Sequence, residues 1–122
     1  MSLQKIFDTI KKNRIFLIST HVNPDPDALA SELALAMYLK AQGKKVYIVN
    51  EERIPPRFLF LPGIRQIRSL QKGMKIIYDV ALIVDCGDLD RIGRVQKILS
   101  VDKPLINIDH HETNQYYGNL NY

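Results

Sequence analysis

Two uninterrupted apolar runs constrain the fold more than any other feature of the chain. Residues 15–18 read IFLI and residues 80–84 read VALIV, and neither run contains a polar position. A strand with one face in water alternates apolar and polar residues, whereas an unbroken run is typical of a parallel strand covered on both faces. The sequence therefore predicts buried parallel strands at residues 15–19 and 80–84.

Weaker patterns supply the elements around these strands. Apolar residues recur at helical spacing in three segments, and two further apolar runs have the length of strands. The predicted helices cover residues 3–12, 28–42 and 89–99, and the further strands cover residues 45–49 and 105–108. Residues 50–79 contain proline and glycine punctuation and receive no firm assignment. Because strands alternate with helices, we predict an α/β fold with an open, mostly parallel sheet and helices on both faces.

The composition is that of one ordinary domain. The chain has 122 residues, of which 46% are hydrophobic, enough for a packed core. Its apolar runs are too short to cross a bilayer and it has one cysteine, Cys86, so we expect a cytoplasmic protein with a reduced, buried Cys86. The net charge of +4 comes without a block of basic residues, and we interpret it as solvated surface.

Three of the predicted strands are followed by side chains that bind metals. These are His21, Asp25 and Asp27 after the first strand, Asp85 after the strand at 80–84, and Asp109, His110 and His111 after the strand at 105–108. Each ending alone fits a turn, a helix cap or a surface loop. In an open parallel sheet, however, the carboxyl ends of the strands meet at one edge, where ligands bind. Together the endings predict a site for Mn²⁺, Zn²⁺ or Fe²⁺, which accept this mixture of nitrogen and oxygen ligands.

The number of ligands favours a pair of ions. One tetrahedral ion does not use as many ligands as these three loops supply, so two ions sharing a carboxylate explain them better. Asp85 is suited to bridge them, because it is the lone carboxylate at the end of a central strand. Two adjacent cations activate a water and stabilise the oxygens of an in-line displacement, which is phosphoester chemistry. We therefore expect a substrate that carries a phosphate.

Four segments carry a resemblance to a known family. Residues 21–29 (HVNPDPDAL), 84–88 (VDCGD), 91–93 (RIG) and 107–114 (NIDHHETN) resemble the successive motifs of the DHH phosphoesterases. The resemblance is strongest to small bacterial oligoribonucleases, or nanoRNases, that also remove phosphate from 3′-phosphoadenosine 5′-phosphate. It implies a manganese-dependent phosphohydrolase whose substrate is a short oligonucleotide or a nucleoside bisphosphate.

The resemblance also implies a role for each site residue. One manganese ion would bind His21, Asp25 and Asp85, and the other would bind Asp27, Asp85 and His110. His111 would face the scissile phosphate, and Asp109 would orient the neighbouring imidazoles. Apart from the resemblance, Arg91 and Arg94 are candidates for a phosphate contact, since guanidinium groups match phosphate oxygens; the alternative, more common for arginines on a short helix, is that they are solvated.

The chain departs from the family pattern at two positions near the first strand. Pro26 replaces a residue that is usually glycine or another small residue, and Ala30 replaces a usual glycine. Proline is favoured at the first position of a helix and pushes the preceding residue into the extended conformation of a cap. We therefore predict that Asp25 caps the helix that Pro26 begins.

The family supplies a further metal-binding aspartate and a substrate-binding domain beyond the position of Tyr122. We therefore expect residues 1–122 to be a partial DHH domain, inactive or weakly active by itself, with an exposed sheet edge that could form a homodimer. Two alternatives stay open: a pyrophosphatase or cyclic-dinucleotide phosphodiesterase of the same superfamily, and a non-catalytic domain that binds a nucleotide or a partner.

Overall fold

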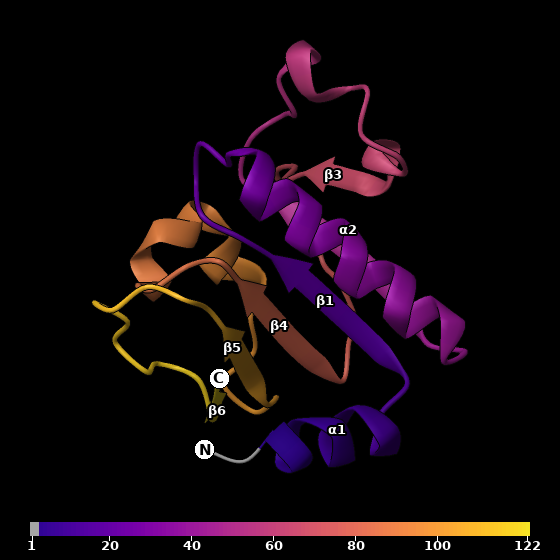
Figure 1. Cartoon of the computed structure of the whole chain (residues 1–122), viewed down its shortest axis with the longest axis vertical. Coiled ribbons are helices and arrows are strands. Elements are labelled where there is room, and N and C mark those ends of the chain that lie inside the picture. The colour runs from indigo at the N-terminus through magenta and orange to yellow at the C-terminus, as the bar shows by residue number, and fades with distance from the viewer. Residues whose placement is uncertain (1–2) are drawn as a thin grey trace.

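The computed structural model describes residues 3–122 and contains a six-stranded sheet in the order β3-β2-β1-β4-β5-β6, with every neighbouring pair parallel (Figure 1). The strands are β1 (Ile15–Ser19), β2 (Lys45–Asn50), β3 (Ile67–Ser69), β4 (Val80–Val84), β5 (Leu105–Ile108) and β6 (Leu120–Asn121). The helices are α1 (Leu3–Lys12) and α2 (Pro26–Ala41), with 3₁₀ segments η1 (Pro56–Phe58), η2 (Ile64–Gln66) and η3 (Leu89–Ile98). Among these residues, no helix has the length and apolarity needed to span a bilayer.

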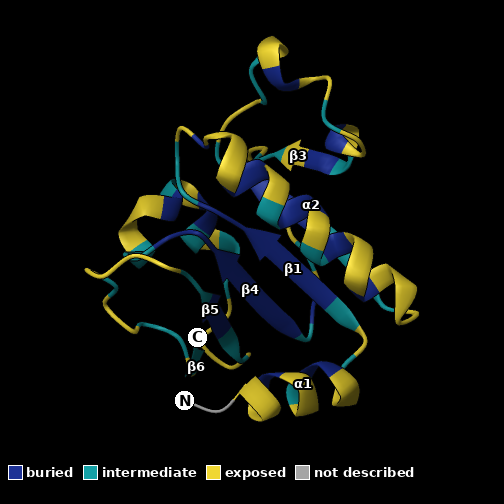
Figure 2. Cartoon of the chain, in the orientation of Figure 1, coloured by how far each residue is buried: buried dark blue, intermediate teal, exposed yellow. Residues whose placement is uncertain are grey.

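Each face of the sheet packs against its own layer. Because side chains alternate along a strand, Phe16 and Leu82 point to one face, where they join Leu29 of α2 in a core cluster that also includes α1. Leu17 points to the other face and packs with Ile92 of η3. The two central strands, β1 and β4, are buried almost throughout (Figure 2). The α/β fold is therefore as predicted, with both α-helices on one face and η3 on the other.

The strength of each sequence pattern explains how well it predicted the structure. The predicted strands at 15–19, 80–84 and 105–108 are confirmed, and β2 is one residue longer than predicted. Strands β3 and β6 were missed, because three and two residues are too few to show an alternation. The helix predicted at 89–99 is a 3₁₀ segment broken at Gly93, where φ is 68° and ψ is −142°.

The start of α2 follows the argument from Pro26. Asp25 is the N-cap, with φ −92° and ψ 175°, and Pro26 occupies the first turn. The Ala28 amide donates a hydrogen bond of 2.8 Å to Asp25 Oδ1. Helix α2 thus begins at Pro26, as that argument predicted and two residues before the helix-like pattern at 28–42, and its capped end lies beside the carboxyl end of β1.

Candidate metal centre

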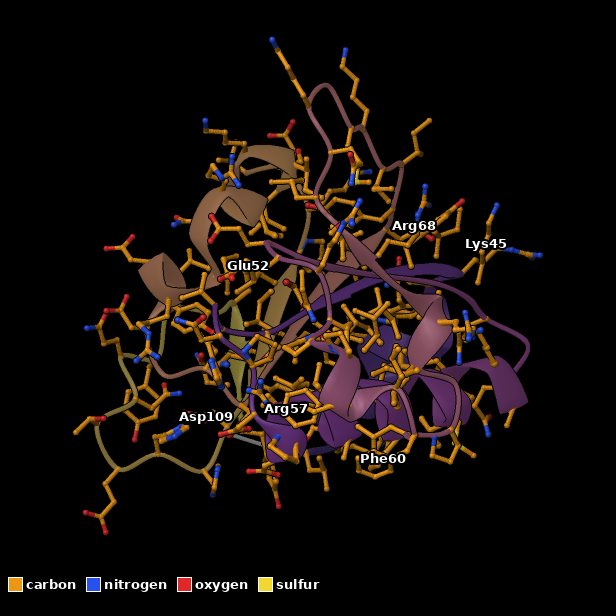
Figure 3. The ribbon with its side chains drawn as sticks, turned by 90° about the horizontal axis from the view of Figure 1, so that it is seen from above. Lys45, Glu52, Arg57, Phe60, Arg68 and Asp109 are labelled. Carbon is orange, nitrogen blue, oxygen red and sulfur yellow. The ribbon has the colours of Figure 1, made fainter. Side chains whose placement is uncertain are left out.

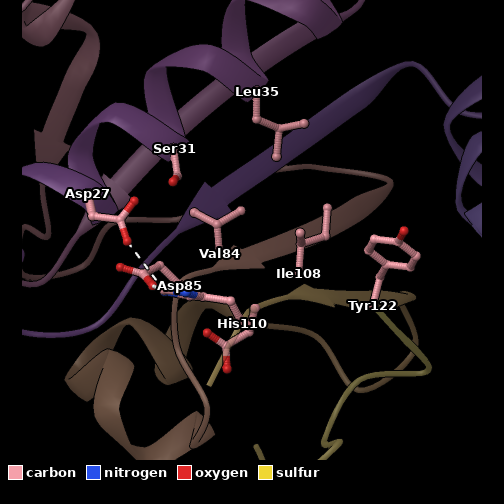
Figure 4. Close-up of a pocket in the computed structure, with 9 residues that line it drawn as sticks. Asp27, Ser31, Leu35, Val84, Asp85, Ile108, His110 and Tyr122 are labelled. Carbon is pink, nitrogen blue, oxygen red and sulfur yellow. Dashed lines mark hydrogen bonds and ion pairs between the residues drawn. The ribbon is translucent and has the colours of Figure 1, made fainter. Parts of the chain in front are cut away.

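Asp85, at the end of β4, is the meeting point of the predicted ligands. His110 Nε2 lies 2.8 Å from Asp85 Oδ1 and 3.4 Å from Asp27 Oδ2. His21 Nε2 lies 3.9 Å from Asp85 Oδ2. Figure 4 shows Asp27 and His110 directed toward Asp85 from α2 and from the segment after β5. The structure thus brings the three strand ends together, as the sequence predicted.

The ligand atoms form two groups that share Asp85. His21, Asp25 and Asp85 each offer an atom within 4.8 Å of the others, and so do Asp85, Asp109, His110 and His111. Two ligands that bind one ion at right angles, with bonds of about 2.0–2.2 Å, lie about 3 Å apart. The spacing between His110 and Asp85 therefore fits a common cation, and the mixed nitrogen and oxygen donors fit a transition metal better than calcium.

The backbone presents the Asp85 carboxylate in an uncommon conformation. Asp85 has φ 52°, in the left-handed region, although it has a side chain. Non-glycine residues adopt this region rarely, and they cluster at functional sites. The strand end is held on the β1 side by Thr20, whose hydroxyl donates a hydrogen bond of 2.7 Å to the Val84 carbonyl. Only 6% of the Asp85 side chain is exposed, so its oxygens face the ligand groups rather than bulk water.

The loop after β1 orients His21. Nδ1 of His21 lies 2.7 Å from the Val22 carbonyl oxygen, so Nδ1 carries the hydrogen and donates it. This tautomer leaves the lone pair of Nε2 free on the side of Asp85, as a metal ligand requires. The Val22 amide in turn donates a hydrogen bond of 2.7 Å to the Arg91 carbonyl. The first ligand loop is therefore tied to η3.

A partly buried hydrogen-bond network holds the segment after β5. His111 Nδ1 lies 2.5 Å from Asp109 Oδ1, and Asn114 donates 2.7 Å hydrogen bonds to Asp109 Oδ2 and to Asn107 Oδ1. Asn107 also lies 2.9 Å from the hydroxyl of Tyr117. Sequence reasoning gave no role to Asn107 or Asn114. The available signal was Asn107 itself, a polar residue inside an apolar strand.

The contact between Asp109 and His111 favours the charged form of each partner. Burial raises the pKa of Asp109, but the hydrogen bonds from Asn114 and His111 outweigh it, and the pKa lies below its ordinary value. The Asp109 carboxylate raises the pKa of His111. Asp109 therefore anchors the His111 ring, whereas the predicted contact of Asp109 with both imidazoles is present for His111 only among the described hydrogen bonds.

Two cavities lie on either side of Asp85. A polar cavity of about 400 Å³ is lined by His21, Asp25, Asp85, Arg91 and His111 together with their neighbours. Arg91 is exposed there, and its side chain makes no hydrogen bond or ion pair within residues 3–122.

The second cavity, of about 560 Å³, has a largely apolar wall that includes Leu35, Val84, Ile108 and Tyr122 (Figure 4). Among the described residues that line these cavities, Arg91 is the one lysine or arginine. Lys45 and Arg68 lie on the other side of the molecule from Asp109 (Figure 3).

Residues 15–122 match the family described as DHH family, N-terminal domain. The chain belongs to the DHH family. It is 39% identical over 108 residues to the bifunctional oligoribonuclease and PAP phosphatase NrnA of Thermus thermophilus, an alignment that covers 84% of this chain and 30% of that protein.

The fold is also similar to that of an exopolyphosphatase-related protein from Bacteroides fragilis, with a TM-score of 0.87 at 24% identity. That similarity covers 98% of this chain and 37% of the other. The chain therefore spans 30% and 37% of the lengths of these two proteins. The resemblance of the sequence motifs to the DHH family and the predicted fold class are both confirmed.

Proposed function

We propose that this DHH domain is the metal-binding part of a manganese-dependent phosphohydrolase that acts on short oligoribonucleotides or 3′-phosphoadenosine 5′-phosphate. The observation that carries the proposal is the sharing of Asp85 by two groups of ligand atoms. The name of the Thermus relative, an oligoribonuclease and PAP phosphatase, supports this choice of substrates.

The proposed ligand sets each take three side chains. His21, Asp25 and Asp85 would hold one Mn²⁺, and Asp27, Asp85 and His110 would hold the other. The support for the second set is that His110 Nε2 contacts both Asp27 and Asp85. Two bound cations would lower the pKa of a shared water and stabilise the attacking and leaving oxygens of an in-line displacement.

Arg91 and His111 are the proposed phosphate contacts. Both line the polar cavity that contains His21, Asp25 and Asp85. Within residues 3–122 the guanidinium of Arg91 has no hydrogen-bond or ion-pair partner, so its donors are available for phosphate oxygens. Nδ1 of His111 contacts Asp109, so Nε2 is the ring nitrogen that would contact the substrate phosphate.

Titration of the chain with Mn²⁺ by isothermal calorimetry tests the metal assignment. We expect two ions per chain, with both affinities lowered in Asp85→Asn and neither changed in Asp102→Asn, an exposed carboxylate in the turn before β5, at the opposite end of that strand from His110. Binding of Mn²⁺ no stronger than to an unrelated acidic protein would overturn the proposal and favour a non-catalytic domain.

Binding of 3′-phosphoadenosine 5′-phosphate and of a ribodinucleotide to the manganese-loaded chain tests the substrate class. We expect both to bind and adenosine to fail, because the proposed contacts are made to phosphate. Tight Mn²⁺ binding without affinity for either nucleotide would overturn the substrate assignment while leaving the metal site intact.

A further inference from the structure

We propose that Glu51, directly after β2, is a positioning residue that directs Arg91 into the polar cavity by holding open the break in η3 at Gly93. The inference rests on the proposed function for the role of Arg91. It concerns a residue that belongs to neither ligand group and that lies on a different strand end from all the predicted ligands.

The Glu51 carboxylate occupies the space at which a side chain on residue 93 would lie. A Cβ built on Gly93 would be 2.5 Å from Glu51 Oε1 and 2.8 Å from Oε2. The same Oε1 accepts a hydrogen bond of 2.8 Å from the Arg94 amide and one of 3.2 Å from Arg94 Nε. Glu51 thus binds the chain at the residue where its direction changes.

The break separates two arginines that a regular 3₁₀ helix would place together. Side chains three residues apart eclipse one another in a 3₁₀ helix, so Arg91 and Arg94 would share one side of an unbroken segment. At Gly93 the backbone instead has φ 68° and ψ −142°. Arg94 pairs with Glu51, and Arg91 lines the polar cavity. Because of the kink, Arg94 pairs with Glu51, whereas Arg91 is available to bind a ligand in the polar cavity.

The segment before the break is attached to the ligand loop. The Arg91 carbonyl accepts the 2.7 Å hydrogen bond from the Val22 amide, next to His21. Ile92 is fully buried in the core on this face. With Glu51 holding Arg94, the four residues 91–94 are fixed at both ends and in the middle, so the loss of Glu51 should loosen the hold on Arg91.

Hydrogen bonds of the preceding residue fix the position of Glu51. The preceding residue, Asn50, is buried, and its Nδ2 donates a hydrogen bond of 2.8 Å to Glu32 of α2. Ser19, at the end of β1, donates to Asn50 Oδ1 over 3.4 Å. The end of β2 is therefore fixed to the two elements that precede and follow the first ligand loop, and Glu51 extends this fixed frame to η3.

Amide hydrogen exchange measured by NMR on the whole metal-free chain tests the geometry without any assay of activity. In Glu51→Ala, exchange at Arg94 and at Val22 should accelerate about 10-fold or more, as loss of a charge-assisted hydrogen bond implies. Glu51→Gln, which keeps the acceptor and the shape, should restore most of the protection. Glu52→Ala, at the exposed neighbouring position, is the matched control and should change neither amide. Unchanged protection of Val22 in Glu51→Ala overturns the proposal, even if the chain binds nucleotides as proposed.

A double-mutant cycle tests whether Glu51 acts through Arg91. The affinity of the manganese-loaded chain for 3′-phosphoadenosine 5′-phosphate should fall about 10-fold in Glu51→Ala and at least as far in Arg91→Ala. The double variant should bind no more weakly than Arg91→Ala alone.

Two results of this cycle would overturn the proposal. One is an additive loss in the double variant, and the other is a loss of Mn²⁺ affinity as large as the loss of nucleotide affinity in Glu51→Ala. If the wild-type chain binds no nucleotide, the proposed function fails, and the exchange rates at Val22 still decide whether Glu51 fixes the segment.

Discussion

Glu32, in the middle of α2, has a wholly buried carboxyl group, and its replacement by glutamine should change how stability depends on pH. Oε1 accepts the hydrogen bond from Asn50, whereas Oε2 has no hydrogen-bond partner among residues 3–122. Burial raises the pKa of Glu32 from 4.5 to about 8, against the opposing effect of the Asn50 hydrogen bond. The folded protein therefore keeps this carboxyl protonated at neutral pH, whereas the unfolded chain ionises it.

The direction and size of the effect follow from this difference in proton binding. Between pH 4.5 and about 8 the folded state holds a proton that the unfolded state releases, so the free energy of unfolding falls as the pH rises. The contribution is fully present below pH 4.5 and fully lost above about pH 8. The shift corresponds to about 5 kcal/mol in total, of which about 4 kcal/mol falls between pH 5 and 9. Glutamine stays neutral throughout and should not show this loss.

Urea denaturation followed by circular dichroism at pH 5, 7 and 9, with EDTA present, measures the effect. The difference in free energy of unfolding between Glu32→Gln and wild type should move in favour of the variant by about 4 kcal/mol from pH 5 to pH 9, since the other titrating groups cancel. Glu52→Gln, at an exposed carboxylate, should run parallel to wild type. A Glu32→Gln curve that also runs parallel would show that Glu32 titrates normally, and the reasoning from its burial would be wrong.

Three further substitutions probe the site and its supports. Asp85→Asn should lower the affinity for Mn²⁺ about 100-fold or more in a calorimetric titration, because both ligand groups lose a carboxylate, and an unchanged affinity would contradict the shared site. Gly93→Ala should lower the free energy of unfolding by about 2 kcal/mol, because the added Cβ would meet the Glu51 carboxylate and because φ is positive at this position. Urea titration measures this, with Asp102→Asn as the control, and equal unfolding midpoints for Gly93→Ala and the control would contradict the prediction. Asn107→Ala should cost about 2–4 kcal/mol by the same measurement, because buried partners lose their hydrogen bonds, and a loss below 1 kcal/mol would argue against the network.

The sequence alone determined the central architecture and the meeting of the candidate ligands. The unbroken apolar runs of β1 and β4 identify strands covered on both faces, because no position along them is suited to water. Once these strands are parallel, their carboxyl ends must share an edge. The convergence of His21, Asp85 and His110 therefore followed from where each strand ends and needed no knowledge of side-chain packing.

Tertiary structure decided the features whose partners lie far apart in the chain. Strands β3 and β6 exist because longer strands beside them supply hydrogen bonds, and neither has a pattern of its own. The break at Gly93 depends on Glu51, 42 residues earlier, and the hydrogen bond from Arg94 to Glu51 spans 43 residues. The apolar periodicity of residues 89–99 predicts a continuous helix, because it depends only on which side chains face the core. It contains no information about the Glu51 carboxylate, which comes from the end of another strand. For the same reason, only the tertiary structure shows that Arg91, and not Arg94, lines the polar cavity.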